Sequence, residues 1–171
     1  MVTKEEKIKM GKKSRKDGAA FELHVRKDLE SRDWIVDKWS NNIEFETATQ
    51  AVTRQLLAIG TGLGAKPMGK IIGAKRKYNP FNKALSIGTG FPDFIAFKKV
   101  CCNECVVPCG YNIIGVESKS NGYLDKAEKE KVEWLLDHKV FDFILIASKG
   151  NERGEILYEQ RLKGGKKQQW K

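Results

Sequence analysis

The sequence lacks any long hydrophobic run. No apolar segment approaches the ~20 residues that a membrane-spanning helix needs. The start of the chain has no apolar stretch of the kind found in secretory signals. We therefore expect a soluble, intracellular protein with no membrane partner. At 171 residues, the chain is long enough to fold as one domain that buries roughly two-thirds of its unfolded surface.

Acidic residues are missing from two segments. Residues 47–92 contain seven basic side chains and no acidic one, and residues 161–171 contain five basic side chains and no acidic one. Together with residues 1–18, which carry +4, these segments carry +16, so the rest of the chain carries −6 within a net charge of +10. Segments without acids are typical of surfaces that bind polyanions. We favour nucleic acid over a membrane surface or a merely solvated face.

Two nucleotide-binding motifs are nearly present, but each lacks a necessary residue. A Gly-x4-Gly-Lys spacing ends at Lys70, but Ile71 follows in place of the serine or threonine that binds Mg²⁺. Residues 60–65 resemble a dinucleotide-binding fingerprint, yet no acidic residue follows before Asp93 to bind the ribose. A nucleotide-binding enzyme is therefore a weak hypothesis for this chain.

Two short apolar segments between residues 90 and 119 predict neighbouring strands. The first, residues 94–97, follows Pro92, whose missing N–H group suits the first residue of a strand. The second, residues 112–116, again has the length of a buried strand. A hairpin in the right register would bring the start of the first strand beside the end of the second.

Three ionisable side chains stand at that junction. Asp93 opens the first predicted strand, and Glu117 and Lys119 end the second on one face, because side chains alternate along a strand. Two carboxylates and an amine at one sheet edge can hold a divalent cation with a lysine beside it. Taken alone, a Glu-x-Lys sequence at a strand end is more often a solvated ion pair.

The order of these elements resembles the PD-(D/E)XK nuclease superfamily, and within it most of all the archaeal Holliday-junction resolvases and related repair nucleases. The resemblance covers about residues 15–40 and 88–150, including a helix over 123–138 after the lysine. The positions that match the family motif are Glu22, on the first helix, and Pro92, Asp93, Glu117, Ser118 and Lys119.

The resemblance implies both a fold and an activity. The implied fold is α/β with a restriction-endonuclease-like core, a central mixed sheet of four or five strands flanked by helices in the order αβββαβ. The implied activity is metal-dependent cleavage of DNA, selective for a DNA structure such as a junction or a repair intermediate. Asp93 and Glu117 would bind Mg²⁺ or Mn²⁺ with the Ser118 carbonyl, Lys119 would orient water or neutralise phosphate charge, and Glu22 would complete the site.

Basic residues outside the motif are expected to contact the substrate. The consecutive cations Lys75, Arg76 and Lys77 precede two aromatic residues, a pattern that suits phosphate contacts and stacking on bases. The alternative for the aromatic residues is to pin a loop to the core. Lys131 lies on the helix after the motif lysine, where the family often carries a residue that touches the phosphate.

The domain organisation follows from these segments. We expect one nuclease domain over 1–171, with a basic, glycine-rich insertion at about 43–89 and a basic C-terminal tail, 161–171, that frays. Asp125 and Glu128 have the spacing of a helix-capping box. The other predicted elements are a helix over 3–32 with a break near Gly11 and Gly18, a helix over 47–59, and strands over 33–40, 141–148 and 155–159.

Four cysteines lie in the predicted hairpin connection, namely Cys101, Cys102, Cys105 and Cys109. Four thiolates can hold a structural Zn²⁺, which would staple the hairpin, although four ligands from one nine-residue loop are cramped. A disulfide within the loop and reduced thiols without a role are the alternatives.

The interpretation that these observations favour is a Mg²⁺-dependent DNA endonuclease in the cytoplasm, associated with the nucleoid. The resemblance also implies a homodimer, because a two-fold dimer cuts two strands symmetrically. No segment of the sequence marks a dimer surface. The alternative is a catalytically inactive, basic nucleic-acid-binding protein, against which the intact set of two acids and a lysine argues.

Overall fold

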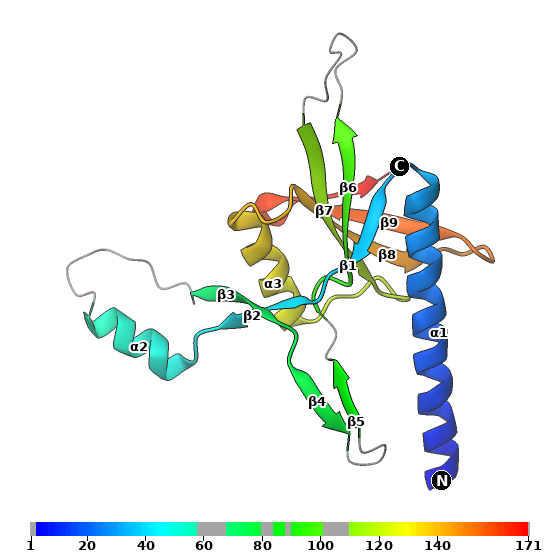
Figure 1. Ribbon diagram of the computed structural model, residues 1–171, viewed down its shortest axis with the longest axis horizontal. Helices are drawn as coiled ribbons and strands as arrows, with labels where there is room; N and C mark the ends of the chain where they lie inside the picture. The colour runs from blue at the N-terminus through cyan, green and yellow to red at the C-terminus, as the bar shows by residue number, and fades with distance from the viewer. Residues whose placement is uncertain (1–2, 58–67, 80–83, 88–89, 101–109, 171) are drawn as a thin grey trace. The chain divides into compact units, whose positions relative to one another are not determined.

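The computed structural model describes residues 3–57, 68–79, 84–87, 90–100 and 110–170 (Figure 1). The chain divides into two compact units. Unit 1 contains Met1–Trp39 and Pro92–Lys171, and unit 2 contains Ser40–Phe91. Unit 2 is therefore inserted in the sequence of unit 1, and it contains the segment expected to be an insertion.

Unit 1 is built on one mixed sheet of six strands in the order β1-β6-β7-β8-β9-β10. The prediction of an α/β fold with a mixed sheet is confirmed. The neighbours β7 and β8 are parallel, and the other neighbouring pairs are antiparallel. The strands are β1 (Ile35–Lys38), β6 (Phe94–Val100), β7 (Gly110–Ser118), β8 (Phe143–Lys149), β9 (Ile156–Arg161) and β10 (Lys167–Trp170).

Helix α1 (Lys4–Ser31) covers one face of this sheet. It is continuous through Gly11 and Gly18, so the predicted break is wrong. An isolated glycine costs a helix about 1 kcal/mol relative to alanine, which weakens the helix but does not end it. Its residues Phe21, Val25 and Leu29 recur at helical spacing on one face and are all buried in the core.

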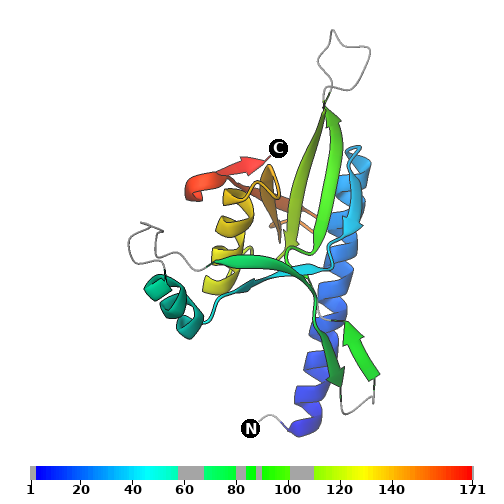
Figure 2. The same ribbon diagram turned by 60° about the vertical axis from the view of Figure 1, so that its left-hand side comes forward.

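Helix α3 (Lys126–Asp137) lies on the opposite face of the sheet (Figure 2). The predicted capping box is confirmed, because Glu128 N–H donates to Asp125 Oδ1 (2.8 Å) and Asp125 N–H donates to Glu128 Oε2 (2.9 Å). The buried side chains of α3 are Val132, Leu135 and Leu136. Both faces of the sheet are thus packed by helices, as in other α/β domains.

The C-terminal segment pairs as β10 with β9, so the predicted frayed tail is wrong for these residues, and the sheet gains a sixth strand. The Trp170 ring makes edge contacts with Trp34 (6.3 Å between centroids) and Tyr158 (5.2 Å). The Arg32 guanidinium lies over the rings of both Trp170 and Tyr158. Tyr158 donates to Asp28 Oδ2 on α1 (2.8 Å), and burial together with this bond raises the pKa of Tyr158. An aromatic and ionic cluster therefore holds the end of the chain against α1.

The described residues of unit 2 form two small antiparallel sheets, β2–β3 and β4–β5, and one helix. The helix confirms the prediction of a helix in this segment over the residues that are described, while residues 58 and 59 of the predicted range lie outside them. Glu44 forms ion pairs with Lys70 (3.4 Å) and Lys75 (2.6 Å). The elements are β2 (Asn41–Phe45), α2 (Ala48–Leu57), β3 (Gly69–Gly73), β4 (Arg76–Asn79) and β5 (Ala84–Ile87).

Among the residues that the structure describes, no helix combines the length and the apolar character needed to cross a membrane.

The Trp170 cluster predicts a stability effect at the C-terminus. Trp170→Ala removes two ring contacts and a cation–π contact, and we expect the free energy of unfolding to fall by about 2 kcal/mol. Gln169→Ala, on the exposed side of the same strand, is the matched control and should change it by at most about 0.5 kcal/mol. Chemical denaturation measures both values. Equal stability of the two variants would contradict the anchoring role of Trp170.

Candidate functional site

The register of β6 and β7 brings the two predicted carboxylates together. Phe94 pairs with Val116, so Asp93 and Glu117 stand side by side at the ends of the two strands. Asp93 N–H donates to Glu117 Oε2 (3.1 Å), and Ser118 N–H donates to Asp93 Oδ2 (2.9 Å). Asp93 is 9% exposed and Glu117 is 5% exposed, which is unusual for acidic residues.

Packing around Pro92 fixes the position of Asp93. Pro92 is fully buried, and a Cβ atom at Gly115 would lie 2.8 Å from Pro92 Cγ and 3.1 Å from Phe141 Cδ2. Only glycine therefore leaves room for Pro92 at this place. Sequence reasoning missed Gly115, although a glycine inside an apolar strand is itself a signal of close approach.

Both buried carboxylates have pKa values above the ordinary range of their residue types. Burial, followed by the charge of Asp93, raises the pKa of Glu117 from 4.5 to about 8, and the Lys119 ammonium opposes this shift. Burial also raises the pKa of Asp93, against the hydrogen bond that Ser118 N–H donates to it. A divalent cation between these groups would remove the repulsion.

The predicted lysine lies beside this pair. Lys119 Nζ is 3.2 Å from Glu117 Oε1 and 2.5 Å from Glu128 Oε1. Burial alone lowers the pKa of the Lys119 ammonium, but the hydrogen bonds to Glu128 and Glu117 outweigh this effect, so the pKa is raised. A lysine in this state stays charged at neutral pH, which suits neutralising or orienting a group better than accepting a proton.

The structure places Glu22 next to the site but in contact with another lysine. Glu22 Oε2 accepts from Lys38 Nζ at 3.2 Å, and the charges of both groups act on the pKa of Asp93 in opposite directions. Arg26, one helical turn after Glu22 on α1, pairs with Glu30 instead (2.8 Å). Sequence reasoning missed Lys38. Lys38 is the last residue of β1 and shares a strand face with Val36, and this alternation could have indicated that its side chain lies on the side of α1.

The oxygen donors present fit a hard divalent cation. Mg²⁺ keeps several waters and is bound through one or two carboxylates plus substrate phosphates rather than by an all-protein cage. Asp93 and Glu117 supply two buried carboxylates, while the described residues contain no cluster of three or more His, Cys, Asp or Glu side chains that could hold a metal ion. The four cysteines lie outside the described residues, and the predicted Zn²⁺ site stays a prediction.

The predicted substrate-binding cations divide between the two units. Lys75, Arg76 and Lys77 belong to unit 2, and Lys131 lies partly buried on α3 in unit 1. The Lys75 side chain is engaged by Glu44, while the side chains of Arg76 and Lys77 lie outside the part of the structure that is described.

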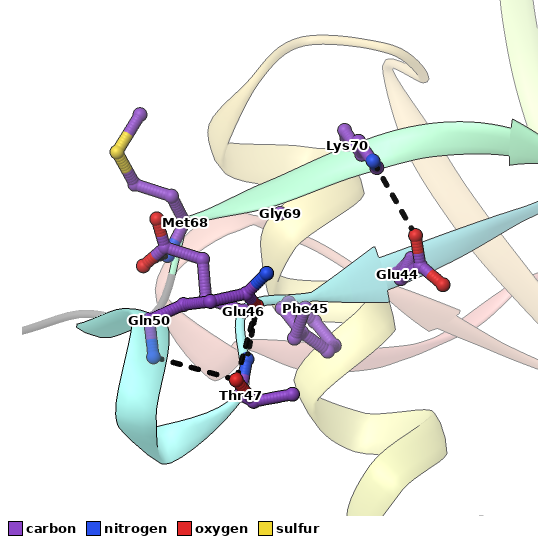
Figure 3. A pocket seen from close by; sticks show the side chains of 8 residues that line it. All are labelled: Glu44, Phe45, Glu46, Thr47, Gln50, Met68, Gly69 and Lys70. Carbon is purple, nitrogen blue, oxygen red and sulfur yellow. Dashed lines mark hydrogen bonds and ion pairs between the residues drawn. The ribbon is translucent and has the colours of Figure 1, made fainter. Parts of the chain in front are cut away.

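Unit 2 contains an open pocket of about 540 Å³ (Figure 3). Its polar groups satisfy one another: Thr47 donates to Gln50 Oε1, and Lys70 pairs with Glu44. Glu46 accepts from Arg54 Nε (3.1 Å) and from the Met68 N–H (3.3 Å). None of the predicted site residues lines it, and its satisfied polar lining does not select a ligand.

No family model, no curated protein and no solved structure matches this chain.

The close packing at Gly115 predicts a matched pair of glycine variants. Gly115→Ala places a methyl group against Pro92 and Phe141, and we expect a loss of about 1–3 kcal/mol of stability from this overpacking. Gly110→Ala on the same strand meets nothing within 4 Å and should be neutral or slightly stabilising. Denaturant titration compares the two variants. If Gly115→Ala were as stable as Gly110→Ala, the packing of Pro92 would not be the constraint described above.

The raised pKa of Glu117 predicts a pH-dependent stability. Because the folded protein binds this proton more tightly than the unfolded chain, stability falls as the pH rises from about 4.5 through about 8. Glu117→Gln keeps an oxygen for the Asp93 N–H and removes the charge, so it should be more stable than the wild type by about 1–3 kcal/mol at pH 8.5 and lose this advantage near pH 4.5.

The measurement is chemical denaturation in EDTA at both pH values. Glu130→Gln, an exposed change of the same charge on α3, is the control and should show no such pH-dependent gain. A Glu117→Gln protein less stable than the wild type at pH 8.5 would contradict a desolvated, repelled carboxylate at this position.

Proposed function

We propose that this protein is a divalent-metal-dependent endonuclease that hydrolyses phosphodiester bonds in DNA, with a preference for a DNA structure such as a junction or a repair intermediate. The observation that carries the proposal is the pair of buried carboxylates, Asp93 and Glu117, joined by hydrogen bonds and flanked by the Lys119 ammonium.

The order of elements in unit 1 supports the finer assignment of the fold. With unit 2 set aside, the chain runs through α1, β1, β6, β7, α3 and β8. This is the αβββαβ order of a restriction-endonuclease-like core, and the two acids and the lysine stand at the strand ends where the PD-(D/E)XK resemblance expects them. We therefore propose that unit 1 is such a core.

Each residue of the site then has a role. Asp93 and Glu117, with the Ser118 carbonyl, would hold Mg²⁺ or Mn²⁺, which supplies Lewis-acid activation of the phosphate and of water. Lys119 carries a positive charge that can neutralise charge building on the phosphate or orient the attacking water. Glu22 and Lys38 border the pair from α1 and β1, where Glu22 opposes and Lys38 favours ionisation of Asp93.

The basic segments supply the affinity for DNA in this proposal. Unit 2 contributes Lys75, Arg76 and Lys77, and residues 5–17 of α1 form an exposed, lysine-rich half of the helix. Cations of this kind bind the sugar–phosphate backbone without reading sequence, so binding should weaken steeply as salt is added. Association with the nucleoid and a homodimer remain predictions that go with this function.

Cleavage of supercoiled, linear and four-way-junction DNA, in Mg²⁺ or in EDTA, tests the proposal. We expect Mg²⁺-dependent cutting by the wild type, and a loss of at least about a hundredfold in Asp93→Asn, Glu117→Gln and Lys119→Met, with DNA binding retained. Glu130→Gln is the matched control and should cut as the wild type does.

The outcomes separate the alternatives. DNA binding without cutting of any substrate would leave a basic nucleic-acid-binding module and overturn the enzyme. An ATP-dependent activity lost in Lys70→Ala would favour the nucleotide-binding hypothesis instead. A loss of cutting in Glu117→Gln would not be due to unfolding, because this variant is expected to be more stable than the wild type at pH 8.5.

A further inference from the structure

Glu128 uses its two carboxylate oxygens for two different contacts. Oε2 accepts from the Asp125 N–H at 2.9 Å and completes the capping box of α3. Oε1 lies 2.5 Å from Lys119 Nζ, at the end of β7. The capping contact fixes the orientation of the carboxylate, so its second oxygen is held toward the lysine.

The Lys119 ammonium is therefore shared between two acids. It lies 3.2 Å from Glu117 Oε1 and 2.5 Å from Glu128 Oε1, and the side chains of these two glutamates are 7% and 18% exposed. The Lys119 side chain itself is 28% exposed, so the two carboxylates hold its ammonium at the edge of the site, where it can reach a bound group.

A divalent cation on Glu117 changes this balance. A cation held by the Glu117 carboxylate would repel the Lys119 ammonium, because both are positive, and would weaken the contact between Lys119 and Glu117. The Glu128 carboxylate lies outside the pair of proposed metal ligands, so it can keep the ammonium within the site.

We propose that Glu128 is a positioning residue, the anchor that holds the Lys119 ammonium beside the reacting phosphate while Glu117 binds the divalent cation. This proposal rests on the proposed function and goes beyond it, because it assigns a second role to a residue that the sequence marks only as part of a helix cap.

Three variants of the full chain separate the anchor from the cap. Glu128→Gln keeps an amide oxygen for the Asp125 N–H but removes the charge that holds Lys119. Asp125→Ala removes the capping side chain and leaves the Glu128 carboxylate in place. Glu130→Gln removes the same charge from an exposed position of the same helix. The readouts are melting temperature, Mg²⁺ binding by calorimetry, and DNA cleavage as a function of Mg²⁺ concentration.

In Glu128→Gln, Lys119 pairs with Glu117 alone and competes with the cation. We expect the half-saturating Mg²⁺ concentration to rise about fivefold or more and kcat to fall about tenfold, with little change in melting temperature. Asp125→Ala should lower the melting temperature and leave the Mg²⁺ dependence unchanged, because the cap and not the anchor is lost. Glu130→Gln should match the wild type in all three readouts.

Two results would overturn the anchoring role of Glu128. One is a Mg²⁺ dependence of Glu128→Gln equal to that of Glu130→Gln, and the other is a shift in the Mg²⁺ dependence of Asp125→Ala as large as that of Glu128→Gln.

A double-mutant cycle with Lys119 tests whether Glu128 instead attracts the cation directly. In a Lys119→Met background, Glu128→Gln should leave Mg²⁺ binding unchanged if Glu128 acts through the lysine, and an undiminished effect would refute that route.

The two proposals fail in different ways. A wild-type protein that neither binds Mg²⁺ nor cuts DNA overturns the nuclease and the anchor together. A wild-type protein that does both, with Glu128→Gln behaving as the wild type, overturns the anchor alone.

Discussion

Two backbone N–H groups hold two acids side by side where β6 begins and β7 ends, and the candidate site of unit 1 depends on this arrangement. The Asp93 N–H donates to the Glu117 carboxylate, and the N–H of Ser118, the residue after Glu117, donates to the Asp93 carboxylate. The bonds orient the side chains but leave both carboxylates buried: burial, followed by the charge of Asp93, raises the pKa of Glu117, and burial is the main cause of the raised pKa of Asp93. A protein selected for stability alone would have no reason to bury two like charges together, and residues in such environments concentrate at functional sites.

The surrounding structure supports the pair from both faces of the sheet. On one face, α1 supplies Glu22, which holds Lys38 at the end of β1. On the other face, α3 supplies Glu128, which holds Lys119 beyond the end of β7. Each helix therefore contributes one glutamate that restrains one strand-end lysine near the acid pair. The arrangement needs the helices as much as the strands, because a lysine side chain is flexible unless a fixed partner orders it.

The convergence of Asp93 and Glu117 could be predicted from the sequence, because it depends on alternation along two strands and on one local hairpin. The capping box at Asp125 could be predicted for the same reason, since its residues are three positions apart. Lys38 and Trp170 could not, because their importance arises from contacts made by the folded chain: Lys38 with α1, and Trp170 with Trp34 and Tyr158. Only one of the two contacts of Glu128 could be predicted. Its place in the capping box of α3 follows from its spacing to Asp125, but its contact with Lys119 requires that α3 pack beside the end of β7.

The charges of the side chains around the acid pair do not balance. Asp93, Glu117, Glu22 and Glu128 carry four negative charges when ionised, and Lys38 and Lys119 carry two positive ones, which leaves a formal charge of −2. One divalent cation would balance that charge. Each lysine is already paired with a glutamate from a helix, so the uncompensated charge is that of the Asp93–Glu117 pair itself. When all these groups are ionised, the two flanking ion pairs therefore leave the charge of the buried carboxylates uncompensated, and a cation bound there would be stabilised by it even in a chain with a net charge of +10.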